Sequence, residues 1–186
     1  MFAVEAGTRV SDIVIRPVRV EDAQAMYDAV RESIPELVQW MPWCHQDYSL
    51  QEAKSWLRTQ VQAFNERRWF EFAILDPGGE YLGQCGLNQM DDANRRCNLG
   101  YWVRSGVTGQ GIAPRAVLMT RDWAFEHTAL ARIEVVIALG NHRSVRVAEK
   151  SGAFREGVAR KRLLLHGVHE DAVMFSFVRP DRAGPT

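Results

Sequence analysis

The sequence predicts an α+β fold in which four helices cover a mixed sheet of seven β-strands. Short runs rich in β-branched and aromatic residues recur along the chain, separated by turn-forming residues. Segments with helical periodicity interrupt these runs irregularly, whereas an all-parallel α/β protein would alternate them. The 186 residues include 46% hydrophobic ones and show no repeat or linker. We therefore expect one domain over residues 1–180, followed by a loose tail at 181–186.

The seven strands are expected where β-forming residues cluster between turn signals. They are predicted at residues 13–18, 70–75, 81–90, 96–103, 132–139, 160–165 and 172–178. The second and third are joined by the Asp-Pro-Gly-Gly turn of residues 76–79, and the last two flank His166 and Gly167. This spacing places three strands in direct succession in the middle of the chain.

The four helices are expected where apolar residues recur at helical spacing. They are predicted at residues 21–35, 49–67, 113–127 and 141–152. Ser49 and Glu52 have the spacing of a capping box, which starts the second helix. Pro35 is expected to end the first helix, because proline lacks the amide hydrogen that a helix interior needs.

Composition and charge exclude several classes of protein. Lysine plus arginine and aspartate plus glutamate both number 23, so net charge gives no support for nucleic acid as a partner. The chain has no basic-then-apolar signal pattern and no apolar run of membrane-spanning length. The three cysteines, Cys44, Cys85 and Cys97, form no Cys-x-x-Cys pair and no zinc-ligand spacing. We expect a soluble cytoplasmic protein with buried free thiols, no metal and no membrane contact.

A glycine-rich turn joins a predicted strand to a predicted helix. It comprises Gly109, Gln110, Gly111, Ile112 and Ala113, with Pro114 next. Glycines let the backbone approach an anion closely, and the start of a helix presents unpaired N–H groups and the positive end of its dipole. Proline suits the first helical turn. A diphosphate group is the expected ligand.

Two common diphosphate sites do not fit this turn. A Walker loop needs Gly-Lys-Ser/Thr, which is absent. A dinucleotide fingerprint needs glycine or alanine at the position of Pro114. Two glycines alone would also suit an ordinary tight turn between a strand and a helix. The other motifs of the chain have to decide between these interpretations.

Those motifs carry a resemblance that covers most of the chain. They are Trp40-Met41-Pro42-Trp43, Leu99-Gly100-Tyr101-Trp102-Val103, Trp123-Ala124-Phe125, Asn141-His142-Arg143-Ser144 and residues 149–157. Together with the glycine turn they resemble the GNAT acetyltransferase superfamily, in its ribosomal-protein serine/alanine N-acetyltransferase branch. The resemblance implies a mostly antiparallel sheet, splayed between its two central parallel strands.

The same resemblance implies acetyl-coenzyme A as the cofactor. Its pantetheine arm would pair with the backbone of Trp102, Val103 and Arg104, and contact Asn141 and Ser144 from the other side. Its pyrophosphate would bind the turn at Gly109, Gln110, Gly111, Ile112 and Ala113. Thr108 departs from the usual Arg or Gln, which removes one side-chain contact but leaves the backbone amides.

The reaction implied is direct attack of an amine on the thioester. Many relatives place a Tyr where this chain has Ala148, so Ser144 becomes the candidate donor to the leaving thiolate. Its alternative role is that of a helix-start residue. Glu134, on a splayed strand, is the first candidate for the base, acting through water; Asp91, Asp92 and Glu71 are the remaining carboxylates.

The acceptor site is expected beside the tryptophan-rich loop of residues 37–43. The substrate-binding candidates are Trp40, Trp43 and Tyr101; the alternative is a hydrophobic cluster that only holds two helices together. The acceptor is expected to be a protein N-terminus of the ribosomal type. A small amine, or a non-catalytic acyl-coenzyme A sensor, are the alternatives. The chain is expected to act as a monomer or homodimer.

Overall fold

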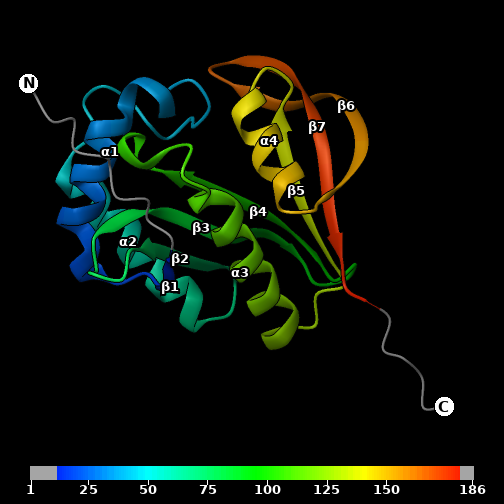
Figure 1. Cartoon of the computed structure of the whole chain (residues 1–186), viewed down its shortest axis with the longest axis horizontal. Coiled ribbons are helices and arrows are strands. Elements are labelled where there is room, and N and C mark those ends of the chain that lie inside the picture. Colours follow the sequence, from blue (N-terminus) through cyan, green and yellow to red (C-terminus); the bar gives the residue numbers. More distant parts are fainter. Residues whose placement is uncertain (1–11, 181–186) are drawn as a thin grey trace, which may run out of the picture.

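The computed structural model describes residues 12–180, which form one seven-stranded sheet with helices on both faces (Figure 1). The strands are β1 Val14–Pro17, β2 Phe70–Leu75, β3 Tyr81–Asp91, β4 Arg96–Val103, β5 Arg132–Ala138, β6 Phe154–Leu165 and β7 Val168–Val178. The helices are α1 Ala23–Leu37, α2 Leu50–Asn65, α3 Ile112–His127 and α4 His142–Lys150, with 3-10 turns η1 Val20–Asp22 and η2 Ser105–Val107. The tail expected at 181–186 lies outside the described residues.

The sheet order is β1-β2-β3-β4-β5-β7-β6, and every neighbouring pair is antiparallel except β4 with β5. These two parallel strands pair only at their beginnings, where Arg96, Cys97 and Asn98 face Arg132, Ile133 and Glu134. Figure 1 shows β4 and β5 meeting at one end and separating toward the other. The predicted sheet, mostly antiparallel and splayed at its two central parallel strands, is confirmed.

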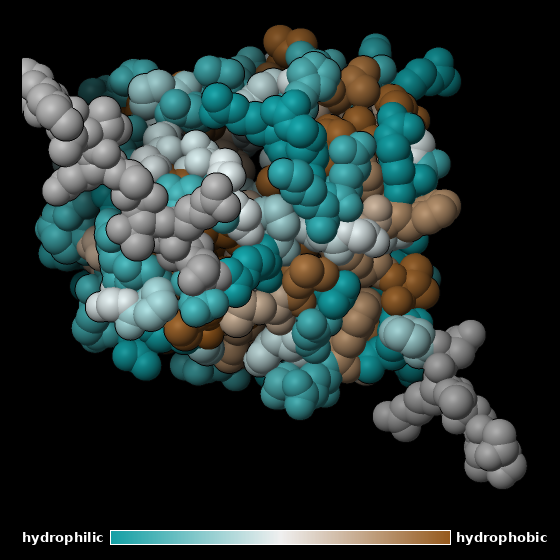
Figure 2. Space-filling view, in the orientation of Figure 1, coloured by the Kyte–Doolittle hydropathy of each residue, from teal (hydrophilic) through white to brown (hydrophobic). Residues whose placement is uncertain are grey.

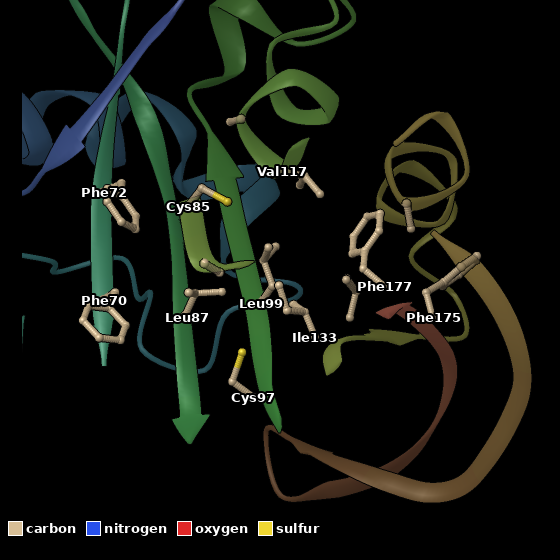
Figure 3. Packing of buried hydrophobic residues seen from close by; sticks show 14 of the residues in the cluster. Phe70, Phe72, Cys85, Leu87, Cys97, Leu99, Val117, Ile133, Phe175 and Phe177 are labelled. Atoms are coloured by element: carbon tan, nitrogen blue, oxygen red, sulfur yellow. The ribbon is translucent and has the colours of Figure 1, made fainter. Parts of the chain in front are cut away.

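Strand alternation divides the buried residues between two layers. On one face, a core that includes Phe72, Leu99 and Phe175 packs beneath α3 and α4 (Figure 3). On the other face, Trp102 joins the core formed with α1 and α2. Because Leu99 and Trp102 lie on opposite faces of β4, this one strand supports both layers. Both layers therefore fix the position of β4.

The main differences from the sequence prediction lie at the end of α1 and at the starts of β6 and β7, where β7 begins at Val168 instead of residue 172. Helix α1 continues through Pro35 to Leu37, because the proline removes only one hydrogen bond near the end of the helix while Ile34 and Leu37 are buried. Strand β6 begins at Phe154, well before residue 160. Its pairing with β7 contains two register shifts, and these irregularities interrupt the alternation from which a strand is predicted.

Two other expectations are confirmed. Ser49 accepts from the amide of Glu52 while the Glu52 carboxylate accepts from the amide of Ser49, so the capping box begins α2 as predicted. The thiols of Cys44, Cys85 and Cys97 are free and buried. Burial raises the pKa of Cys85 and of Cys97 to about 12. These thiols remain protonated and unreactive at neutral pH.

The outer hairpin of β6 and β7 leaves apolar side chains exposed. Val158, Leu164 and Val168 are each about half exposed. Figure 2 shows hydrophobic residues interspersed with hydrophilic ones on this side of the molecule. Within residues 12–180, none of the helices is both long and apolar enough to cross a membrane.

Gly83 allows β3 to approach β4 closely, and its replacement tests how tightly β4 is held. Its φ is +151°, and a Cβ built there would lie 2.2 Å from the backbone oxygen of Trp102. We expect Gly83→Ala to lower the free energy of unfolding by about 2 kcal/mol or more, because backbone atoms cannot move aside. Urea denaturation would measure this.

The control is Gly78→Ala in the turn before β3. A Cβ at Gly78 would meet only the Asp76 side chain, 3.3 Å away. Its cost should stay below about 0.5 kcal/mol. Equal costs for the two variants would contradict the close contact between β3 and β4.

Candidate functional site

The gap between β4 and β5 is bounded by two strand edges that face each other. Beyond Asn98, β4 is paired on its other side with β3 as far as Val103, and β5 is paired with β7 along its whole length. Within the described residues, no pairing joins the two facing edges past Glu134. Free backbone edges of this kind can hydrogen-bond an extended ligand as a sheet holds a strand. Trp102 and Val103 lie on β4 beyond the segment that pairs with β5.

Arg104 takes no part in this edge. Its amide donates to Leu82 O at 2.8 Å and its carbonyl accepts from Val107 N at 3.2 Å. Its guanidinium pairs with Glu32 and Glu80. The backbone pairing that we expected for Arg104 is therefore not supported, because both of its backbone groups are engaged within the chain. Arg104 instead fixes the end of β4.

The Arg104 contacts also hold the segment that leads into the glycine turn. Glu32 of α1 accepts from the amide of Gly106 at 2.8 Å, and Ser33 Oγ accepts from the amide of Ser105 at 2.9 Å. Hydrogen bonds from the Arg104 guanidinium lower the pKa of Glu32, which therefore stays ionised. Helix α1 thus positions the loop that precedes the start of α3.

The glycine turn forms the N-terminus of α3. Gly109 has φ +81° and Gly111 has φ +82°, and no atom lies within 4 Å of a Cβ built on either residue. Gly111 is the N-cap, and Ile112 and Ala113 bury their side chains in the core. The first amides of a helix lack acceptors within the helix. In α3, the amide of Arg115 donates to the carbonyl oxygen of Gly111, the capping residue, at 3.4 Å. The start of α3 presents amides to an anion, and Gln110 lies between the two glycines of the turn.

The start of α4 lies across the gap from β4. Asn141 Oδ1 accepts from the amide of Ser144 at 3.1 Å, so Asn141 is the capping residue. The Tyr101 hydroxyl donates to Ser144 O at 3.0 Å and connects β4 to α4. Burial raises the pKa of Tyr101 above its ordinary value. Since Asn141 caps the helix, the alternative role of Ser144 as a cap is not supported. Its Oγ has no partner within residues 12–180.

A cavity of about 1140 Å³ lies on the α1–α2 face, beside β4. Its walls come from α1, the loop after it, α2, β2, β3 and β4. They include Met26, Met41, Trp43, Tyr48, Trp56, Gln60, Trp69, Gln84, Asn88, Gly100, Tyr101 and Trp102, with the charged residues Glu52, Glu66, Arg67, Arg68, Glu71 and Asp92. Gly100, Tyr101 and Trp102 belong both to the cavity wall and to the open edge of β4. The cavity and the gap therefore meet at this strand.

The three acceptor-site candidates do not all line this cavity. Trp43 does, and its ring lies 6.3 Å from that of Trp102. Tyr101 does, although its hydroxyl is directed to α4. Trp40 does not: its ring packs 3.5 Å from the position of a Cβ on Gly140, beside Asn141. The loop between α1 and α2 thus reaches the turn before α4, and Trp40 belongs to the side of the gap.

Two polar atoms in the cavity wall have no hydrogen-bond partner within residues 12–180. They are the hydroxyl of Tyr48 and the indole Nε1 of Trp69. Native proteins rarely leave such atoms unpaired. Their presence in one wall favours a polar ligand in this cavity. Among residues 12–180, no cluster of His, Cys, Asp and Glu side chains is suited to bind a metal ion.

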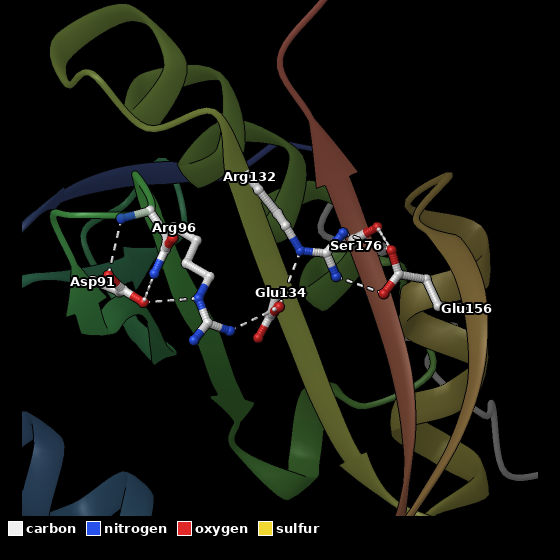
Figure 4. Close-up of polar contacts among 7 residues, drawn as sticks. Asp91, Arg96, Arg132, Glu134, Glu156 and Ser176 are labelled. Atoms are coloured by element: carbon white, nitrogen blue, oxygen red, sulfur yellow. Dashed lines mark hydrogen bonds and ion pairs between the residues drawn. The ribbon is translucent and has the colours of Figure 1, made fainter.

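Glu134, the first candidate for the base, is held by arginines instead of facing the cavity. Its Oε1 lies 3.0 Å from Arg132 Nε and 3.4 Å from Arg96 Nη1. Arg96 also pairs with Asp91, and Arg132 with Glu156, in a chain of charges across the sheet (Figure 4). Glu134 lies where β4 and β5 are still paired, at the closed end of the gap. Because its carboxylate is held by two arginines and does not line the cavity, the assignment of Glu134 as the base is not supported.

Glu71, one of the remaining carboxylates considered above, is placed differently from Glu134. It lies at the beginning of β2, lines the cavity and has no hydrogen-bond or ion-pair partner for its side chain within residues 12–180. Burial raises its pKa to about 8. No sequence motif marks Glu71. Only the pairing of β2 with β3 places it in the wall of the cavity.

Comparisons with known proteins agree with this geometry. Residues 12–153 match the family described as acetyltransferase (GNAT) domain. The Bacillus subtilis protein YdaF, provisionally named a ribosomal N-acetyltransferase, is 27% identical over 176 residues, covering 92% of this chain and 94% of YdaF.

Solved structures give the same result. The ribosomal-protein-S5-alanine acetyltransferase of Vibrio fischeri superimposes with a TM-score of 0.82 at 25% identity, covering 91% of this chain and 94% of that one. Mycobacterium smegmatis RimJ, solved with a coenzyme A disulfide, superimposes with a TM-score of 0.80 at 26% identity, covering 91% and 83%.

The chain belongs to the GNAT acetyltransferase family. Enzymes of this family transfer an acetyl group and use acetyl-coenzyme A. Its resemblance to the ribosomal-protein serine/alanine branch is confirmed by the names of these relatives.

The charge chain of Figure 4 predicts a stabilising role for Glu134. We expect Glu134→Gln to lower the free energy of unfolding by about 1–2 kcal/mol, because Arg96 and Arg132 lose their shared partner. The pH dependence of kcat/KM for acetyl transfer should stay that of the wild type. Loss of the acidic limb of that profile would restore Glu134 as the base.

Proposed function

We propose that this protein transfers the acetyl group of acetyl-coenzyme A to the α-amine of a protein or peptide N-terminus. One observation carries the proposal: the open edge of β4 at Gly100, Tyr101 and Trp102 borders both the gap between β4 and β5 and the large cavity. An extended cofactor in the gap and an amine in the cavity would meet at this strand. The names of its relatives favour a ribosomal acceptor.

The residues around the gap fit the cofactor. The backbone of Trp102 and Val103 would hold the pantetheine arm, with Asn141 opposite, and the turn from Gly109 to Ala113 would hold the pyrophosphate. Open space beside Gly109 and Gly111 leaves room for a bulky anion. When bound, acetyl-coenzyme A supplies the thioester that the amine attacks.

Ser144 is proposed as the proton donor at the sulfur. Its hydroxyl is half-buried, and Asn141 already caps α4 through the Ser144 amide. The Tyr101 hydroxyl holds Ser144 through its carbonyl oxygen, which leaves Oγ to turn toward the gap. Backbone amides on the open edge of β4, near Val103, would stabilise the charge that develops on the carbonyl oxygen.

The cavity wall suits a cationic amine carried on a larger molecule. Of the described residues, four carboxylates and two arginines line it: Glu52, Glu66, Glu71, Asp92, Arg67 and Arg68. Its volume, about 1140 Å³, exceeds the roughly 300–1,000 Å³ of small-molecule pockets. Tyr48 and Trp69 offer polar atoms to a peptide backbone. The excess of carboxylates also favours a polyamine, which is the second candidate.

We further propose that the protein acts in the cytoplasm as one acetyltransferase domain of residues 1–180. The exposed apolar side chains of β6 and β7 favour a homodimer over a monomer, because large exposed apolar patches commonly mark interfaces. The balanced charge of the chain, 23 basic and 23 acidic residues, gives no support for nucleic acid as a partner.

An acceptor panel tests this function. Thiol release from acetyl-coenzyme A would be measured with peptides that begin with Ser or Ala, the same peptides with blocked N-termini, and spermidine. We expect turnover only with free N-terminal peptides. Ser144→Ala should lower kcat by about 10- to 100-fold with an unchanged melting temperature.

Other outcomes would reject parts of the proposal. Turnover with spermidine alone would make the second candidate correct. Binding of acetyl-coenzyme A without turnover on any acceptor would indicate a sensor. Wild-type rates for Ser144→Ala would remove Ser144 from the chemistry while leaving the acceptor assignment intact.

A further inference from the structure

We infer that Glu71 is the general base that takes the proton of the acceptor amine. This inference rests on the proposed function, because it assigns a role in the same site. It replaces the hypothesis that Glu134 supplies the base. Three observations carry it: the position of Glu71 in the cavity, the glycine floor beside it and its lack of a charged partner.

Glu71 lies on a row of paired residues that leads to the open edge of β4. In register, Glu71 of β2 faces Gly86 of β3, and Gly86 faces Gly100 of β4. A Cβ on Gly86 would lie 1.8 Å from Glu71 Oε2, so the carboxylate lies over the Cα of this glycine. Gly100 has no side chain either. Two glycines therefore form a floor between the carboxylate and the strand that borders the gap.

Because no side chain stands on this floor, an amine bound there could contact Glu71 and the gap at the same time. On the same face, Gln84 and Asn88 flank the row, and both line the cavity. Gln84 is already committed, donating to the Tyr81 hydroxyl at 2.6 Å and accepting from Trp102 Nε1 at 3.1 Å. Among the carboxylates of the wall, Glu52 and Glu66 are bonded to His45 and to Arg68 respectively. Glu71 is the one that lies in the row beside β4.

The surroundings of Glu71 keep its affinity for a proton high. The titratable or charged groups around it are Arg16 of β1, Tyr81 and Cys85 of β3, Tyr101 of β4, Tyr48 before α2, Glu52 of α2, Glu66, Arg67 and Arg68 after α2, and Asp92 after β3. Arg16 is paired with Asp22 and Arg68 with Glu66. Burial accordingly raises the pKa of Glu71 to about 8. This value matches the pKa of an α-amine, about 8, far better than that of lysine, about 10.4.

The proton balance of the step is simple. The ammonium group gives one proton to the ionised Glu71, which leaves a neutral amine and a neutral carboxylic acid. The nitrogen lone pair then forms the N–C bond while the C–S bond breaks and its electron pair leaves with sulfur. Ser144 gives its hydroxyl proton to that sulfur and takes the second nitrogen proton in its place, and Glu71 releases its proton to solvent through the cavity. One ammonium and one thioester thus yield one amide, one thiol and one proton.

The first test is kinetic. Wild type, Glu71→Gln and the control Glu134→Gln would be compared on a peptide with a free N-terminal Ser or Ala, from pH 6.5 to 9.5. We expect Glu71→Gln to lose about 100-fold in kcat/KM at pH 7. The loss should shrink as the pH rises above the pKa of the amine, because the substrate then arrives neutral. Glu134→Gln should keep the wild-type dependence on pH.

The second test needs no turnover. Carboxyl ¹³C NMR of the protein labelled in glutamate would follow Glu71, assigned by the signal missing from Glu71→Gln. We expect a midpoint near pH 8. Because the folded pKa is raised, protonated Glu71 stabilises the fold at low pH, and this contribution is lost as the pH rises through about 8. The melting temperature of Glu71→Gln should therefore rise relative to that of the wild type as the pH increases from 5 to 9.

The outcomes separate this inference from the proposed function. An active wild type with a Glu71→Gln variant within twofold of it at pH 7 would overturn the inference alone. A Glu71 midpoint below pH 5 would also overturn it, whatever the activity. A wild type without turnover on any acceptor would overturn both.

Discussion

The site depends on one constraint, which is that β4 and β5 pair for only three residues. Each strand is fully committed on its other side, β4 to β3 and β5 to β7. The two halves of the sheet can therefore separate without leaving either strand unsupported. The separation exposes backbone edges at the centre of the molecule, where both helical layers keep them in place. A fully paired sheet would have no such edges to offer a ligand.

The contacts around the gap keep it open in a defined shape. Arg104 and Glu32 tie the end of β4 to α1, and the same glutamate holds Gly106 before the glycine turn. Across the gap, the Tyr101 hydroxyl joins β4 to the start of α4. Ion pairs and hydrogen bonds of this kind fix the relative orientation of the elements, which the non-directional apolar contacts of the core do little to fix. They bring the start of α3, the start of α4 and the cavity to one strand.

The elements of the fold could largely be predicted from the sequence, because their signals are local. Ser49 and Glu52 cap the start of α2 through contacts only three residues apart, and the β-branched runs alternate over a few residues. Pro35 misled the prediction because burial of Ile34 and Leu37 outweighs one lost hydrogen bond. The glycine turn could be predicted as a strand-to-helix turn because Gly109 and Gly111 adopt a positive φ that other residues rarely do. Asn141 was expected only as a cofactor contact, and its role as the cap of α4 comes from the structure. The engagement of Arg104 could not be predicted, since it depends on Leu82 and Glu32, which are distant in the sequence.

The catalytic base was even harder to predict from the sequence than the contacts of Arg104. Glu134 was a reasonable candidate on the strand order alone, but Arg96 and Arg132 neutralise it across strands whose register the sequence does not reveal. Glu71 owes its position to the glycines opposite it on β3 and β4. A carboxylate without partners, facing a cavity, can be recognised only when the neighbours on every side are known.

The central claim is that the open edge of β4 and the glycine turn bind one extended molecule together. An amide-resolved NMR titration with coenzyme A tests it most directly. We predict shifts of the amides of Gly109, Gly111, Ile112 and Ala113 that saturate together with those of Trp102 and Val103, at one dissociation constant. Shifts confined to the glycine turn, with Trp102 and Val103 unmoved, would contradict the account.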